Sequence, residues 1–157
     1  MACDVREWIA GLAGPIQAAG NGPKPDPAHG DAHLSNFLFP KGASDGPACI
    51  LDWQFWQPTI GGTDLAFMMA TECEPEPRRH LEQTLLRRYH RRLLTQGVRD
   101  YRWDDCWDNY GFSVILVSIF IPVWRWAIFK WAPDMSALNS SMTAFEDLKC
   151  SELLNVK

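Results

Sequence analysis

The stretch HGDAHLSNFLF, residues 29–39, places two histidines, an aspartate and an asparagine within eight positions and then continues into apolar residues. Such a density of polar side chains cannot be buried cheaply, because each unpaired buried polar group costs roughly 1–3 kcal/mol. The segment is therefore either a solvated turn or a loop whose polar atoms have a chemical role. The choice depends on what the rest of the chain places beside it.

The stretch ends in a short apolar run, NFLF, and a second apolar run, ACILDW, follows after PKGASDGP. Apolar runs around a Gly/Pro/Asp turn predict a β-hairpin, which would bring Asp31 and Asp52 close together although some twenty residues separate them. Asn36 adds an amide oxygen on the same loop. Two carboxylates and an amide form an oxygen-only set, which suits magnesium and not zinc.

The rest of the chain predicts helices. Gly20–Pro27 holds three prolines and two glycines and should contain nothing regular. Thr63 is placed to cap a helix that begins at Asp64, and Pro75 and Pro77 should end it and open the next helix. Apolar side chains at helical spacing predict further helices over residues 4–19, 78–96, 103–131 with a bend near Pro122, and 135–148.

The fold class that follows is mainly α (α+β), with helices around one small β-hairpin that presents polar residues at its ends. The 157 residues, 46% of them hydrophobic and 22% charged, suit a single globular domain over 1–157. The uncharged segment of residues 110–124 is too short to span a bilayer and is interpreted as a buried core helix.

The net charge of −4 argues against nucleic acid and anionic membranes as partners. Five scattered cysteines without a C-x-x-C pair indicate reduced thiols, and the first residues contain no apolar signal segment. We therefore expect a cytoplasmic protein.

The motif H-x-D-x-x-x-x-N, followed by ILDWQ and then GGTDLAFM, resembles the catalytic segment of the aminoglycoside phosphotransferase family and its choline-kinase-like and ecdysteroid-kinase-like relatives. The resemblance implies a kinase-like C-terminal lobe that transfers the γ-phosphate of ATP, with Mg2+, to a hydroxyl of a small molecule. By position it implies that Asp31 is the catalytic base and that Asn36 and Asp52 are the magnesium ligands. It further implies that His29 and Asp64 support the catalytic loop.

The first 28 residues contain no Gly-x-Gly-x-x-Gly, and Lys24 between prolines is their only lysine. Such a kinase needs both a phosphate-covering loop and a lysine that pairs the nucleotide phosphates. We therefore expect a C-terminal lobe without its N-terminal lobe, weak binding of magnesium-nucleotide and negligible transfer by the isolated chain. We also expect exposed apolar residues near the hairpin, with poor solubility or self-association.

Other interpretations of the motif remain open. A non-catalytic kinase-like remnant would keep the same residues without turnover. A metal-dependent hydrolase could use His29, Asp31 and His33 as ligands, although such sites usually want further histidines. A plain polar turn would use Asp31 and Asn36 as turn formers. It does not explain why Asp52 and Asp64 also stand at the spacing of the kinase-like motifs.

Two further patterns concern substrate and surface. The arginines of residues 78–94 lie opposite a leucine stripe, which indicates a solvated face. In YRWDDCWDNY, two acids and two tryptophans recur one helical turn apart, which would suit a cationic acceptor; the commoner arrangement has the rings in the core and the acids in water. The candidate substrate residues are Asp104, Asp108, Trp103 and Trp107.

Overall fold

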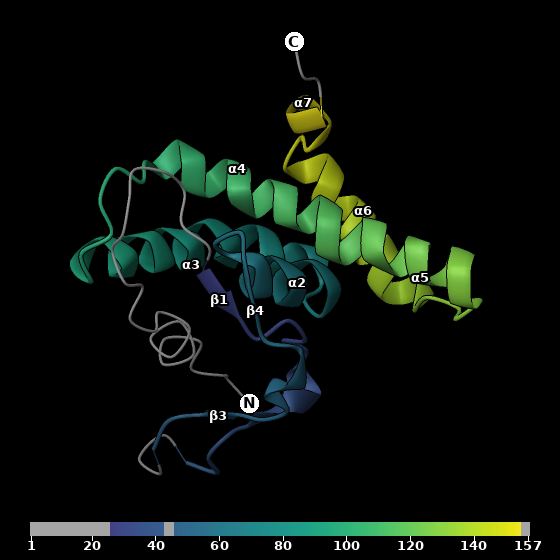
Figure 1. The fold of residues 1–157 in the computed structure, drawn as a ribbon, viewed down its shortest axis with the longest axis horizontal. Helices are drawn as coiled ribbons and strands as arrows, with labels where there is room; N and C mark the ends of the chain where they lie inside the picture. The colour runs from purple at the N-terminus through teal and green to yellow at the C-terminus, as the bar shows by residue number, and fades with distance from the viewer. Residues whose placement is uncertain (1–25, 43–45, 155–157) are drawn as a thin grey trace.

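A computed structural model describes residues 26–42 and 46–154. Within these residues the chain is mainly helical and has two small two-stranded sheets (Figure 1). The mainly-α prediction is therefore confirmed for the described part. The helix expected over residues 4–19 lies outside it.

The two sheets are both antiparallel pairs. Strand β2 (Phe37–Leu38) pairs with β3 (Cys49–Ile50), which confirms the predicted hairpin with strands of only two residues. Strand β1 (Asp26–Ala28) pairs with β4 (Gln57–Thr59). The prediction that residues 20–27 contain nothing regular is therefore wrong at its last two positions. A proline lies in each of these strands, and two-stranded sheets tolerate proline because every strand is an edge.

Helix α2 (Thr63–Thr71) lies at the centre of the core. It contacts α3 (Pro75–Thr95), α4 (Trp103–Ser113) and α6 (Met135–Asp147). Its sequence is apolar on nearly every face, as expected of a helix that is enclosed by others. The buried cluster joins α2 to the hairpin and to the neighbouring helices through Ala32, Phe37, Leu65, Ala66, Met69, Leu86, Tyr89, Tyr110, Val114 and Ala144.

The start of α2 differs from the prediction. Gly62, at φ 86°, is the N-cap, and Thr63 is the first helical residue. The Thr63 hydroxyl donates to the carbonyl of Ile60 at 2.6 Å and lies 3.3 Å from the Ser113 hydroxyl. Thr63 therefore does not cap the helix, because its hydroxyl bonds backwards into the preceding turn and toward α4.

Helix α3 opens at the prolines as predicted, and Gly97 follows it in the left-handed conformation at φ 95°. The predicted stripe is buried at Leu85, Tyr89 and Leu93, whereas Leu81 is 46% exposed. Most arginines of α3 are solvated, as predicted. Arg78 is the exception, because it is fully buried.

Arg78 lies at the centre of a buried polar network. Its guanidinium donates to both Glu82 carboxylate oxygens at 2.9 and 3.0 Å and also bonds to Asp147 on α6. The Tyr110 hydroxyl donates to Glu82 at 3.2 Å, and burial raises the pKa of both Glu82 and Tyr110. This network connects α3, α4 and the end of α6. The sequence did not indicate it, because Asp147 is 69 positions away from Arg78.

Helix α4 continues through the π-helical η3 (Val114–Phe120) into α5 (Ile121–Phe129). The predicted irregularity near Pro122 is therefore a wide turn just before the proline. Proline lacks an N–H and its ring collides with the carbonyl four positions earlier, which a π-turn relieves. The core-helix prediction for residues 110–124 is right for Tyr110, Gly111, Ser113, Val114 and Ser118, which are buried, but wrong for Phe112 and for α5, which has no buried residue.

Residues 103–129 form the one helix, within the described chain, that is long and apolar enough to cross a membrane by length and composition, and its apolar window is only 17% buried. Helix α6 confirms the helix predicted over residues 135–148, and the short α7 (Ser151–Leu154) follows it. Four cysteines lie in the described part, and all four are free thiols, namely Cys49, Cys73, Cys106 and Cys150.

Candidate functional site

The loop of residues 29–36 runs from β1 into β2, and Asp64 at the start of α2 holds its first turn. The Asp64 carboxylate accepts the backbone N–H of His29 at 2.6 Å and that of Gly30 at 3.0 Å. Asp64 is only 4% exposed, and its burial raises its pKa although the two backbone hydrogen bonds act in the opposite direction. The hydrogen bonds predicted for Asp64 are therefore confirmed.

Gly30 is needed where the loop turns. Its φ is 82°, and a Cβ at this position would lie 2.3 Å from the carbonyl oxygen of Phe55. Only glycine adopts this conformation without strain and allows the Phe55 backbone to approach so closely. The sequence patterns did not identify Gly30 as part of the site. Its position between His29 and Asp31 is the feature that could have indicated it.

His29 joins the loop to the segment that ends at Asp52. Its side chain is fully buried, Nε2 lies 2.7 Å from the Leu51 carbonyl oxygen, and the ring packs edge-on against Trp53 at 4.9 Å. The Leu51 N–H donates to the Asn36 carbonyl at 2.8 Å. Both backbone groups of Leu51 thus bond to the loop. Asp52, the next residue in the chain, therefore lies next to a residue that is attached to the loop.

Asn36 and Asp31 interact directly. The Asn36 side-chain NH2 donates to the Asp31 backbone carbonyl at 2.8 Å and to its carboxylate at 3.3 Å. An amide that donates through nitrogen keeps its oxygen as an acceptor, and this oxygen could face a cation. His33 Nε2 lies 3.4 Å from the Asp31 carboxylate, and the Ser35 hydroxyl lies 2.6 Å from His33 Nδ1.

Asp52 has the left-handed backbone conformation, with φ and ψ both 60°. Its side chain is exposed, and its carboxylate accepts from the Gln54 side chain at 3.3 Å. Left-handed residues other than glycine are strained, and they gather at functional sites where the surrounding structure holds them. An exposed carboxylate on a strained backbone is consistent with a metal ligand. The role predicted for Asp52 stays a prediction.

The donor set of Asp31, Asn36 and Asp52 fits a hard cation, because it offers carboxylate and amide oxygens. Magnesium retains water and takes phosphate oxygens, so it needs few protein ligands. Among residues 26–42 and 46–154, no group of three or more His, Cys, Asp or Glu side chains could hold a metal ion. The hydrolase alternative is wrong for this geometry, because His29, Asp31 and His33 do not form such a group in the described part of the chain.

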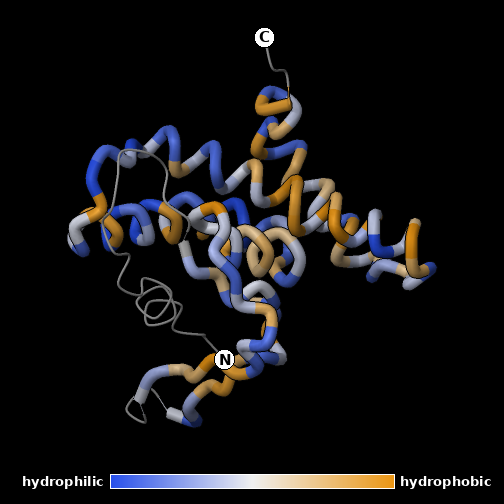
Figure 2. The backbone as a smooth tube through the Cα atoms, viewed as in Figure 1, coloured by the Kyte–Doolittle hydropathy of each residue, from blue (hydrophilic) through white to orange (hydrophobic). Residues whose placement is uncertain are grey.

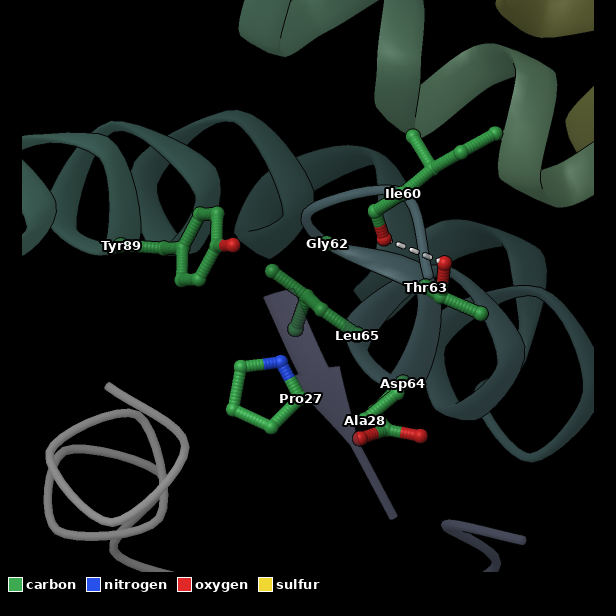
Figure 3. A pocket seen from close by; sticks show the side chains of 8 residues that line it. All are labelled: Pro27, Ala28, Ile60, Gly62, Thr63, Asp64, Leu65 and Tyr89. Carbon is green, nitrogen blue, oxygen red and sulfur yellow. Dashed lines mark hydrogen bonds between the residues drawn. The ribbon is translucent and has the colours of Figure 1, made fainter. Parts of the chain in front are cut away.

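A small cavity lies behind the loop, between β1, α2 and α3 (Figure 3). Its volume is about 10 Å³, which is about the space that one water molecule needs. Pro27, Leu65 and Tyr89 line it, and the Asp64 carboxylate lies at its edge beside β1. The cavity is therefore a packing defect next to the support of the loop. It is too small for a nucleotide or an acceptor.

The acids and tryptophans at the start of α4 lie away from the loop. Figure 1 places this end of α4 near the far end of α3, whereas the loop lies below β1. The Arg87 guanidinium already lies 4.1 Å from the centre of the Trp103 ring, and the Trp103 and Trp107 rings pack on the core 5.7 Å apart. Asp104 and Asp108 are exposed. The four residues therefore do not lie beside the loop. Their arrangement is the commoner one, with the rings packed on the core and the acids in water.

Residues 28–99 match the model of the Ecdysteroid kinase-like family. The match covers the loop, the hairpin, α2 and α3, and it confirms the resemblance to kinase-like phosphotransferases for that part of the chain. Families of this kind use ATP and Mg2+ in general. No curated protein and no solved structure matches the chain.

Proposed function

Because residues 28–99 match the model of the Ecdysteroid kinase-like family, we propose that this chain forms the catalytic lobe of a phosphotransferase that acts on a small-molecule hydroxyl. The observation that supports this most is the double attachment of the loop of residues 29–36. Asp64 holds its beginning, and Leu51 bonds to it directly before Asp52. The three proposed functional residues thus belong to one braced unit.

In the proposed reaction, Asp31 orients the acceptor hydroxyl and accepts its proton. The acceptor oxygen forms a bond to the γ-phosphorus while the bond from phosphorus to the leaving ADP oxygen breaks. The Asn36 side-chain NH2 donates to the Asp31 carboxylate at 3.3 Å and would hold it in place. Phosphoryl transfer depends mainly on such positioning of the reacting groups. Asn36 and Asp52 would hold Mg2+, which supplies charge neutralisation at the phosphates.

A second lobe would cover the nucleotide. The loop, the hairpin and the segment that follows it expose large apolar side chains, each between 43% and 63% accessible, namely Leu34, Leu38, Leu51, Trp53, Phe55 and Trp56. A concentration of exposed apolar side chains in one part of the chain is typical of an interaction site. Within the proposal, the lobe that packs there carries the lysine and the loop that grip the phosphates. The isolated chain should then bind magnesium-nucleotide weakly and transfer phosphate negligibly.

The acceptor in this proposal is a small hydroxyl compound, and the chain needs no nucleic acid. Sugars, amino alcohols and steroid-like alcohols are all candidate acceptors, because the loop does not contain the residues that would select among them. The arrangement at Trp103 reduces the case for a cationic acceptor, since Arg87 already covers that ring.

Calorimetric titration of the purified chain with ATP, with and without Mg2+, tests the proposal. We expect weak binding that requires Mg2+ and is lost in Asp52→Asn. Asp100→Asn is the matched control, because Asp100 is also an exposed, left-handed aspartate, at φ 57°. A non-catalytic remnant would show no Mg2+-dependent binding, or binding that Asp52→Asn leaves unchanged, and either result would contradict the proposal.

A further inference from the structure

Helix α5 lies at the outer end of the long α4–η3–α5 rod, at the edge of the molecule (Figure 1). It contains no buried residue, and its contacts are mainly with η3, the segment directly before it. Its accessible side chains are apolar and large. They are between 47% and 59% exposed at Trp124, Trp126, Ile128 and Phe129, and Trp131, just beyond the helix, is 60% exposed. Figure 2 shows orange, hydrophobic segments beside pale and blue ones at this end of the rod.

The rod cannot cross a bilayer as a whole, because its first half belongs to the core. Tyr110 and Val114 are fully buried and pack with α2 and α6 in the core cluster. The nine residues of α5 form the part of the rod without any buried residue. Nine helical residues extend roughly 14 Å, about half of a hydrocarbon core of about 30 Å. This end is long enough to enter an interface and too short to span.

The exposed aromatic rings and the cations of this end form one cluster. The Trp131 ring lies 5.4 Å from Phe129, and Phe129 packs edge-on against Trp124 at 5.8 Å. The Arg125 guanidinium lies 5.1 Å from the centre of the Trp131 ring. Lys130 Nζ lies 5.9 Å from the centre of the Trp126 ring. Tryptophan beside lysine and arginine is the composition that places side chains at the boundary between lipid headgroups and acyl chains.

The local charge contrasts with that of the chain. Between Asp108 and Asp134, Arg125 and Lys130 are the only charged residues, and both are positive, whereas the whole chain has a net charge of −4. A surface of exposed tryptophans and two cations, without a carboxylate between them, complements an anionic bilayer surface. The same segment of a second copy would present the same two cations and no carboxylate, so it offers no opposite charge to this surface.

We propose that residues 120–131 attach the chain to anionic membrane surfaces, with the α5 aromatic side chains among the headgroups and Arg125 and Lys130 at the lipid phosphates. This contact is peripheral, and it revises the expectation of a chain without a membrane partner. It uses none of the residues of the proposed phosphotransferase site. Each of the two proposals can therefore fail without the other.

Flotation of the purified chain with vesicles tests the proposal, in the absence of nucleotide and Mg2+. We expect the chain to float with vesicles of phosphatidylcholine and about one third phosphatidylglycerol, and poorly with phosphatidylcholine alone. Each cation near an anionic surface strengthens binding by roughly fivefold, so Arg125→Gln/Lys130→Gln should weaken it by roughly 30-fold. Trp124→Ser/Trp126→Ser, which removes two of the exposed rings, should abolish flotation.

Arg91→Gln/Arg92→Gln is the matched control, because it removes two positive charges from exposed positions of α3 and should leave flotation unchanged. All the substituted side chains are exposed, and circular dichroism checks that each variant folds. Equal binding to neutral vesicles, equal loss in the α3 control, or no flotation would overturn the proposal. A dimer in light scattering that the α5 variants dissociate, without flotation of the wild type, would overturn it in favour of self-association.

Discussion

The Asp64 carboxylate accepts the backbone N–H of His29 at 2.6 Å although 35 positions separate the two residues in the chain. The conformation of the loop therefore depends on the first turn of a buried helix. Any change at Asp64 reaches the candidate site through two hydrogen bonds, because Gly30 donates to the same carboxylate.

Replacing Asp64 by alanine should destabilise the fold. It leaves the N–H groups of His29 and Gly30 without their acceptor, and each unsatisfied buried donor costs roughly 1–3 kcal/mol, so we expect a loss of about 2–6 kcal/mol. Asp64→Asn keeps one acceptor oxygen and should lose about half as much. Urea unfolding measures both. Asp104→Ala, at an exposed position of α4, is the control, and an equal loss in the control would contradict the role of Asp64.

Gly30→Ala should destabilise more than a left-handed backbone alone explains. Gly97→Ala is the matched control, since Gly97 also has positive φ, 95°, but a Cβ there meets nothing within 4 Å. We expect a loss of about 1 kcal/mol at Gly97 from the left-handed conformation. At Gly30 the collision with the Phe55 carbonyl should raise the loss to about 2–4 kcal/mol. Thermal or urea unfolding compares the two, and equal losses would show that the Phe55 contact is unimportant.

The buried Arg78 network should be sensitive to the loss of its central cation. Arg78→Ala leaves Glu82 buried without its partner, which typically costs about 3–5 kcal/mol. Arg79→Ala is the control, because Arg79 bonds to the same Asp147 but its side chain is 45% exposed, and it should have a far smaller effect. Arg78→Met, which replaces the cation by an apolar side chain of similar length, would not rescue the fold while Glu82 remains. Equal losses in Arg78→Ala and Arg79→Ala would contradict this account.

Cys150 should make stability depend on pH in alkaline solution. Its thiol is fully buried, donates to the Gly111 carbonyl at 3.5 Å, and has its pKa raised by burial to about 11. The ordinary value is 9.0, so the thiol ionises first in the unfolded chain. Its contribution to stability is therefore complete below pH 9 and is lost as pH rises through 11.

The comparison of wild type with Cys150→Ala in urea, at several values between pH 8 and 11, isolates this thiol from lysines and tyrosines that titrate in the same range. The difference in stability between the two proteins should fall as pH rises above 9. At pH 8, iodoacetamide should label the exposed Cys49 and spare Cys150. A difference that does not change with pH would show that Cys150 ionises equally in both states.

Local patterns predicted much of this fold, and distant partners explain what they missed. The turn between two apolar runs was sufficient for the β2–β3 hairpin, and helical spacing was sufficient for the α3 stripe except at Leu81. The β1–β4 pair was missed because its prolines are typical of loops. The burial of Arg78 was missed because its charge is compensated from the end of α6. In the site, the motif order predicted the hydrogen bonds of Asp64, whereas the backbone strain at Asp52 leaves no mark in the sequence.

In the proposed function, the loop of residues 29–36 and Asp52 form one site for a metal-bound nucleotide. Nuclear magnetic resonance of 15N-labelled chain tests it most directly, with ATP and trace Mn2+, because the paramagnetic ion broadens only the signals near it. We expect the Asn36 side-chain amide and the backbone amides of Asp31 and Asp52 to broaden first, and Asp52→Asn to abolish this broadening. Broadening centred on Asp104 and Asp108 instead, or equal broadening in Asp52→Asn, would contradict the claim.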